Sequence, residues 1–163
     1  MNKITIDLDT SVSNIIENVD LTKKIESIVH LALKEENIDV PHVFVSIAAV
    51  SSDKIREINN KYRNIDNSTD VLSFPIFEKY ELENISKLEN GKKPKEIELG
   101  DIILCIDVIK EHAKEYGTGI YREVLYMITH ATFHLLGYDH MVDDEKKVMR
   151  EKEEKILSKI GEI

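Results

Sequence analysis

The segment from Ile120 to Leu136 restricts the fold more than any other part of the chain. Its apolar residues cover most of the circumference of a helix, and they are Val124, Leu125, Met127, Ile128 and Leu135. A helix of this kind is stable only where other elements surround it, because apolar surface left in water loses the free energy of burial. The pattern therefore predicts a central, buried helix around which the rest of the chain packs.

Two histidines on this predicted helix, His130 and His134, lie four residues apart, so their rings stand one turn apart on the same face. Gly137 follows them, and glycine is the residue best able to adopt the left-handed conformation that ends a helix. The chain can then turn and bring His140 back toward the first two rings. Three neutral imidazole nitrogens with a fourth position open form the ligand set of a catalytic zinc ion.

The spacing of these histidines, with a glycine three residues after the second, is also that of the metzincin proteases. Those proteases carry a glutamate directly after the first histidine, where it acts as the general base. This chain has Ala131 there, and a methyl group can neither accept a proton nor polarise a water molecule. The motif thus predicts a metal site and disfavours a peptidase, but it does not name the reaction.

The length of 163 residues fits one domain, and no repeat or domain-scale linker divides it, so residues 1–163 are predicted to form a single unit. The composition, 42% hydrophobic and 33% charged, is that of a soluble globular protein. The single cysteine, Cys105, lies in an apolar run and is expected to be a core residue. Without disulfides, a signal peptide or a membrane span, a reducing, cytoplasmic location is expected.

The net charge of −9 argues against broad, nonspecific affinity for nucleic acid, because phosphate binding draws mainly on Lys and Arg. DNA and membranes are not expected partners. A cleft that holds a divalent metal and one or two arginines can nevertheless be locally positive on an acidic protein. The acidic balance is therefore compatible with a specific anionic substrate.

Strands and helices alternate along the chain and predict an α/β (α+β) fold with about four strands and about five helices. The expected strands are 3–8, 43–49, 71–74 and 99–106, and the expected helices are 20–37, 53–62, 107–116, 120–136 and 143–159. Strand 43–49 is apolar at nearly every position, which predicts burial on both faces. The polar, charged segment 76–98 is expected to be a solvated excursion from the domain.

Arg63 precedes a loop, 64–70, that is dense in turn-forming side chains. Its planar guanidinium suits phosphate recognition, and loops between a helix and a strand often carry function. The alternative is a solvated cation that satisfies carbonyls at a helix end. The role of Asp101 is also open, since it is either a turn residue or a carboxylate that orients one of the histidines.

The motifs around these residues resemble those of a known family. Residues 60–63 read Asn-Lys-Tyr-Arg, residues 69–75 read Thr-Asp-Val-Leu-Ser-Phe-Pro, residues 99–102 read Leu-Gly-Asp-Ile, and residues 130–140 read His-Ala-Thr-Phe-His-Leu-Leu-Gly-Tyr-Asp-His. In combination and order they resemble the YbeY family of bacterial rRNA-processing endoribonucleases. The departures are Ser68 where the family commonly has proline, Ala131 in place of glycine and Phe133 in place of leucine.

This resemblance implies one Zn2+ ion held by His130, His134 and His140, in a cleft also lined by Arg63. It implies a single α/β domain with a small mixed sheet, and cleavage of single-stranded RNA in ribosomal RNA maturation and ribosome quality control. The small ribosomal subunit and its assembly factors would be partners. In the expected mechanism, Arg63 offsets charge that develops on the phosphate in the transition state.

Two other functions remain open at this point. The chain could be a non-enzymatic, zinc-stabilised ribosome assembly factor, in which case protein side chains should fill all four positions around the metal. It could also be a zinc metallohydrolase or protease of another substrate, because three histidines do not name a substrate. The motif offers three ligands, which favours an enzyme.

Overall fold

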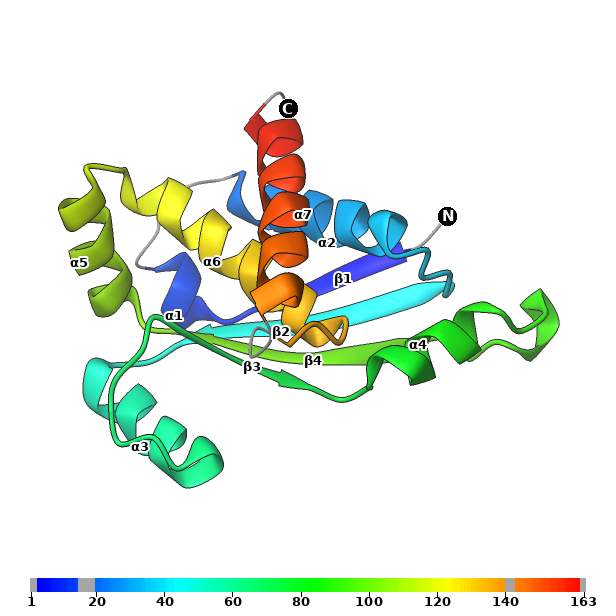
Figure 1. Cartoon of the computed structure of the whole chain (residues 1–163), viewed down its shortest axis with the longest axis horizontal. Helices are drawn as coiled ribbons and strands as arrows, with labels where there is room; N and C mark the ends of the chain where they lie inside the picture. The colour runs from blue at the N-terminus through cyan, green and yellow to red at the C-terminus, as the bar shows by residue number, and fades with distance from the viewer. Residues whose placement is uncertain (1–2, 15–19, 140–142, 162–163) are drawn as a thin grey trace.

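The computed structural model describes residues 3–14, 20–139 and 143–161. Four strands and seven α-helices follow one another along these residues, with one short turn of 3-10 helix (Figure 1). The strands are β1 (Lys3–Leu8), β2 (His42–Ala49), β3 (Val71–Pro75) and β4 (Ile97–Leu104). The helices are α1 (Thr10–Ser13), α2 (Leu21–Glu35), α3 (Ser52–Arg63), α4 (Lys79–Ser86), η1 (Asn90–Lys92), α5 (Ile106–Tyr116), α6 (Ile120–Leu135) and α7 (Asp143–Gly161).

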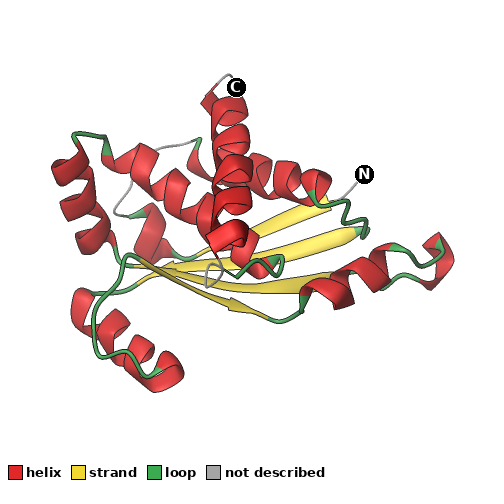
Figure 2. Ribbon diagram, in the orientation of Figure 1, coloured by secondary structure: helices red, strands yellow, loops and turns green. Residues whose placement is uncertain are grey.

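The four strands form one mixed sheet in the order β1-β2-β4-β3 (Figure 2). β1, β2 and β4 are parallel neighbours, and β3 pairs antiparallel with β4 at the edge. Parallel strands that are neighbours in a sheet need long crossover connections. The connection from β1 to β2 contains α2, and the connection from β2 to β4 runs through α3, β3 and α4. This arrangement confirms the predicted α/β class and the predicted mixed sheet.

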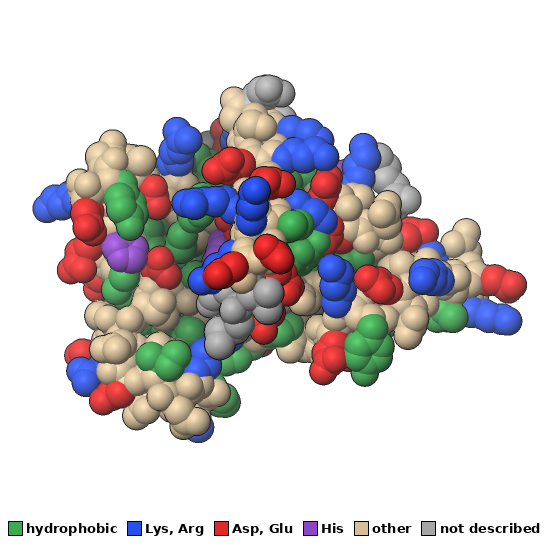
Figure 3. All heavy atoms as spheres, viewed as in Figure 1, with side chains coloured by type: hydrophobic (Ala, Val, Ile, Leu, Met, Phe, Trp, Pro, Cys, Tyr) green, Lys and Arg blue, Asp and Glu red, His purple; other side chains and the backbone are tan. Residues whose placement is uncertain are grey.

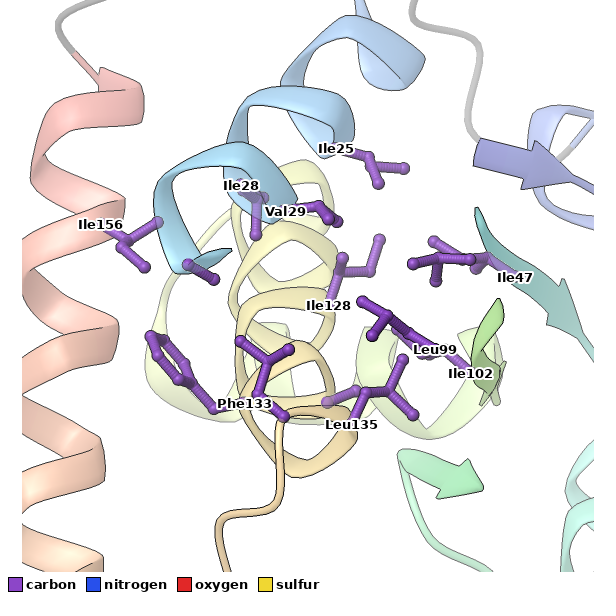
Figure 4. Close-up of a cluster of buried hydrophobic side chains, with 14 of the residues drawn as sticks. Ile25, Ile28, Val29, Ile47, Leu99, Ile102, Ile128, Phe133, Leu135 and Ile156 are labelled. Carbon is purple, nitrogen blue, oxygen red and sulfur yellow. The ribbon is translucent and has the colours of Figure 1, made fainter. Parts of the chain in front are cut away.

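The helix that carries the histidines, α6, is central and buried, as its sequence predicts. It lies against β3 and β4 on one side and against α2 and α7 on the other. Phe133 and Leu135 near its C-terminal end are fully buried and share one core cluster with Ile28 of α2 and Ile156 of α7 (Figure 4). Burial of each such side chain contributes about 1.5–3 kcal/mol, so the histidines stand on a firmly held element.

β2 is buried on one face only, so the prediction of burial on both faces is wrong. Its residues alternate between buried and partly exposed, and the partly exposed side chains of the middle of the strand are Phe44, Ser46 and Ala48. The cause is the distribution of the helices. In Figure 1, α2, α6 and α7 lie on one side of the sheet, whereas α3 lies on the other and covers only one end.

Most residues of the segment 76–98 are exposed, and the segment is anchored to the domain at a few points. It contains α4, whose Leu82 is fully buried in the main core. Ser86 Oγ accepts a hydrogen bond from the backbone N–H of Asp39, and the Lys93 ammonium pairs with the Asp39 carboxylate at 2.7 Å. Phe77 and Ile85, on either side of Leu82, are partly buried against the same core, so a few apolar side chains dock this mostly polar helix.

The described residues form seven α-helices, where the sequence predicts about five. The two additional helices, α1 and α4, are short and mostly polar, so hydrophobic periodicity does not reveal them. Within the described ranges, no helix has the length and apolar character needed to cross a membrane. Cys105 is buried, as predicted, and burial raises the pKa of its thiol.

Gly100 of β4 lets two other elements approach the sheet closely. Its φ is +144°, a conformation that residues with a side chain rarely adopt. A Cβ at this position would lie 2.2 Å from the carbonyl oxygen of Phe74 in β3 and 3.0 Å from Leu135 Cδ2 at the end of α6. The glycine therefore helps to seat the histidine-bearing end of α6 on the sheet.

Gly100→Ala is expected to lower the free energy of unfolding by about 2–4 kcal/mol, because it combines backbone strain with a steric overlap. Urea denaturation measures this loss. Gly91→Ala is the matched control, since a Cβ at Gly91 would meet no atom within 4 Å. Equal losses of unfolding free energy in the two variants would show that the close approach at Gly100 does not contribute to stability.

Candidate metal centre and groove

The C-terminal end of α6 forms one wall of a cavity of about 620 Å³, within the size range of small-molecule sites. The end of α3, the loop 64–70 and β3 form the opposite wall. His130 and His134 from α6 line this cavity together with Arg63 from α3. The structure thus brings together three of the four predicted site residues, and the fourth, His140, lies outside the described residues.

The two histidine rings meet through their Nε2 atoms, which are 3.1 Å apart. Each ring is held by a contact at its other nitrogen. His130 Nδ1 lies 2.7 Å from Oε1 of Glu153, and His134 Nδ1 lies 2.7 Å from the carbonyl oxygen of Tyr138. A carboxylate and a carbonyl are acceptors, so both Nδ1 atoms carry the proton and donate.

This assignment leaves each Nε2 of a neutral ring with a lone pair. The two Nε2 atoms lie 3.1 Å apart, and each can bind a cation through its lone pair. Histidine nitrogens bind zinc at about 2.0–2.1 Å, which places two ligands of a tetrahedral site about 3.3 Å apart. The separation and the tautomers therefore fit a divalent metal of the zinc type.

The third predicted ligand cannot be placed, because His140 falls in the segment 140–142, outside the described residues. Among the residues that the structure describes, no set of three His, Cys, Asp or Glu side chains comes together as a metal site. The described part of the candidate centre is therefore a pair of imidazoles, His130 and His134. The predicted trio stays a prediction.

Glu153 of α7 is a site residue that the sequence reading misses. Its carboxylate is 3% exposed and contacts His130 Nδ1 across 23 positions of sequence. A carboxylate on the far nitrogen of a ligand histidine fixes the ring and raises its basicity. A sequence signal existed: Glu153 interrupts the buried stripe of α7, which otherwise consists of Met149, Ile156 and Ile160.

The turn after α6 holds the second ring. Gly137 adopts a φ of +102°, as expected for a residue that ends the helix, and the chain then presents the Tyr138 carbonyl to His134. The Tyr138 hydroxyl accepts a hydrogen bond from Lys152 Nζ at 2.6 Å, and Lys152 also pairs with Glu36 of the turn after α2. Burial raises the pKa of the Tyr138 hydroxyl, so this phenol stays protonated at neutral pH.

Arg63 ends α3 and faces the same cavity as the histidines. One of its terminal nitrogens donates to the carbonyl oxygen of Ser73 in β3 at 2.7 Å, and the guanidinium lies 5.9 Å from the centre of the Phe74 ring. The acceptor belongs to a strand and not to the last turn of α3. The contact orients the guanidinium along the cavity wall, where a planar fork suits a phosphate.

The charges along the cavity are not predominantly positive. Among the described lining residues, Arg63 is the cation, and Asp70 and Asp139 are carboxylates. The face seen in Figure 3 likewise intersperses acidic and basic side chains without one large basic patch. A metal ion at the histidine pair would add to the positive charge that Arg63 offers a phosphate in this cavity.

Two further sequence hypotheses concern Ala131 and Asp101. Ala131 is fully buried and lines the cavity, so no carboxylate occupies the position of the metzincin base. Asp101 is exposed and lines a separate cavity on the other face of the sheet, with Asp7 and Ser46. Of the two site histidines that the structure describes, Asp101 shares a cavity with neither, and the carboxylate at His130 Nδ1 is that of Glu153.

Together the fold and the site define an α/β domain with a histidine-lined groove between a buried helix and the edge of a mixed sheet. The family model described as Endoribonuclease YbeY matches residues 6–161. This chain belongs to that family.

Two relatives and one solved structure agree with the match. An Endoribonuclease YbeY from Clostridium botulinum is 40% identical over 162 residues, which cover 92% of this chain and 94% of the relative. One from Caldicellulosiruptor bescii is 41% identical over 159 residues, 96% of this chain and 91% of the relative. A solution structure of a Thermotoga maritima protein is similar at a TM-score of 0.59 and 32% identity, covering 96% of this chain and 88% of that one.

Proposed function

We propose that this chain is a zinc-dependent endoribonuclease that cleaves single-stranded RNA during ribosomal RNA maturation and ribosome quality control. Membership of the Endoribonuclease YbeY family supports the activity and the substrate class. The small ribosomal subunit and its assembly factors are the partners we propose. The cavity that contains His130, His134 and Arg63 is the proposed active site.

The observation that carries the metal is the arrangement of the histidine pair. Both rings donate from Nδ1, to Glu153 and to the Tyr138 carbonyl, and both direct Nε2 to one point. His130 and His134 would hold the ion together with His140. When bound, zinc supplies Lewis acidity at the scissile phosphate.

The side chains of the chain itself have separate tasks in this proposal. Arg63, held by Ser73, offsets the charge that builds on the phosphate oxygens in the transition state. Tyr126 lines the same cavity, and burial, together with the nearby Glu153, raises the pKa of its hydroxyl. Tyr126 therefore remains a hydrogen-bond donor at neutral pH. The fully buried Ala131 keeps the wall beside His130 apolar.

The substrate class is tested by incubation of metal-analysed protein with single-stranded ribosomal RNA and, in parallel, with casein. We expect internal cleavage of RNA and no cleavage of casein. Cleavage of casein that a chelator abolishes would support a metalloprotease instead. Zinc-loaded protein that binds ribosomal RNA but cleaves neither substrate would support the non-enzymatic assembly factor.

Glu153→Leu is expected to weaken zinc binding by about 10–100-fold, because His130 loses the carboxylate that orients it. The metal-free protein should lose about 1–3 kcal/mol of unfolding free energy, because His130 Nδ1 is left without its acceptor. Competition with a chromophoric chelator measures the affinity. The zinc affinity of Glu153→Gln, which keeps an acceptor, should fall between that of Glu153→Leu and that of wild type. Equal zinc affinity in all three proteins would remove Glu153 from the site.

A further inference from the structure

A second hollow adjoins the cavity described above. Its volume is about 520 Å³, and α4 forms one side while the turn after α6 forms the other. The two hollows share Pro75, His134 and Tyr138 as lining residues. His134 therefore lies where the two hollows meet, with Arg63 in the first cavity and α4 along the second hollow.

An endonuclease cuts an internal bond, so its substrate must leave the site in two directions. One nucleotide flanks the scissile phosphate on each side, and each needs a surface to rest on. The cavity with Arg63 supplies one such surface, and the hollow along α4, which shares His134 with that cavity, supplies another. Its volume falls within the range of about 300–1,000 Å³ typical of small-ligand sites.

Tyr80 gives this second hollow the means to bind a base. The side chain lines the hollow and is 60% exposed, so its ring is accessible to a ligand in the hollow. Aromatic rings on which single-stranded bases stack are the sequence-tolerant contact of RNA-binding surfaces. A tyrosine beside a proposed RNA cleavage site is therefore suited to hold one base of the substrate.

The charges of the hollow favour contact through the base over contact through phosphate. Lys79 lines it, and its ammonium lies 4.5 Å from the centre of the Tyr138 ring. Glu78 and Glu83 line it as well, so the charges of the lining do not sum to a basic surface. Stacking on Tyr80 should therefore contribute more than attraction to Lys79.

The position of α4 relative to the histidines is fixed by a close contact. A Cβ on Gly137 would lie 2.6 Å from Lys79 Cβ and 2.8 Å from Lys79 Cα, so the absence of a side chain at Gly137 lets α4 begin directly against the turn. Leu82, one turn further along α4, is anchored in the core. Tyr80 thus stands on an element held against the site at both points.

We propose that Tyr80 and the hollow between α4 and the turn after α6 form a nucleotide subsite, on the side of the scissile phosphate opposite Arg63. This inference rests on the proposed function and specifies the path of the RNA. It gives α4 a role in substrate binding. The sequence alone presents α4 as part of a solvated excursion.

The test uses a labelled single-stranded RNA oligonucleotide with one cleavage site. Binding is measured by fluorescence anisotropy in excess chelator, where no cleavage is needed. Stacking of one base is worth about 1–3 kcal/mol, so Tyr80→Ala should raise the Kd on the order of tenfold. Tyr80→Phe should bind like wild type, and Lys79→Gln should change the Kd less than threefold. Tyr116→Ala, which removes a tyrosine of similar exposure outside both hollows, is the control.

A second arm locates the contact. The Kd of wild type and of Tyr80→Ala is measured for two shortened oligonucleotides. One lacks the nucleotides on one side of the cleavage site, and the other lacks those on the opposite side. Removal of one flank should abolish the difference between the two proteins, and removal of the other should preserve it. Equal Kd values for Tyr80→Ala and wild type on the full oligonucleotide would overturn the subsite. Tyr80-dependent binding without cleavage by the zinc-loaded protein would overturn the proposed function and leave the subsite standing.

Discussion

RNA cleavage by the His134→Ala variant is expected to be on the order of a thousandfold slower than by wild type. His134 offers Nε2 beside that of His130, and the Tyr138 carbonyl holds its ring through Nδ1. Lewis-acid stabilisation by a metal is worth several kcal/mol, and about 4 kcal/mol corresponds to a thousandfold in rate. Initial cleavage rates on a single-site RNA oligonucleotide measure the loss.

The control for this variant is His30→Ala, which removes a histidine from α2, outside the groove. The free energy of unfolding of both metal-free variants should stay within about 1–2 kcal/mol of wild type, because His134→Ala removes one hydrogen bond to the turn. A folded His134→Ala protein that cleaves RNA within tenfold of the wild-type rate would show that cleavage does not require metal binding by this ring.

Arg63→Ala is expected to cleave RNA on the order of a hundredfold more slowly while it binds zinc like wild type. The guanidinium is oriented by Ser73 along the wall of the cavity, and removal of one charged contact to a developing oxyanion commonly costs about 2.7–4 kcal/mol. Most of the effect should appear in kcat, because the contact strengthens in the transition state. Arg63→Lys should recover only part of the rate, since an ammonium lacks the planar fork.

Lys61→Ala is the matched control for Arg63→Ala, because it removes the same charge from the same helix at a residue outside the cavity. Its rate should stay close to that of wild type. If Arg63→Ala and Lys61→Ala slow cleavage equally, Arg63 contributes only to the overall field of the protein. If Arg63→Ala also loses zinc, its role is structural.

The central helix and its histidines could be predicted from sequence because both depend on local spacing. An apolar helix with His130 and His134 one turn apart fixes a pair of rings on a buried element, whatever the rest of the chain does. The left-handed turn at Gly137 follows from the same local chemistry. The alternation of elements was similarly sufficient for the fold class and for the four strands.

The contacts that complete the site could not be predicted because they join distant segments. Glu153 reaches His130 from α7, and its only mark in the sequence is a charge within an apolar stripe. The adjacency of α4 to the histidines depends on the packing of Lys79 against Gly137, which no periodicity reveals. The half-exposed face of β2 also depends on distant segments, since the composition of the strand does not say on which side of the sheet the helices pack.

Zinc bound per chain, measured together with RNA cleavage, tests the metal centre most directly. Purified wild-type protein is stripped with a chelator, titrated with zinc, and assayed at each step for bound metal and cleavage rate. We expect one zinc ion per chain at saturation and a cleavage rate that rises in proportion to the bound zinc. Metal-free protein that cleaves RNA as fast as the saturated protein would contradict this expectation.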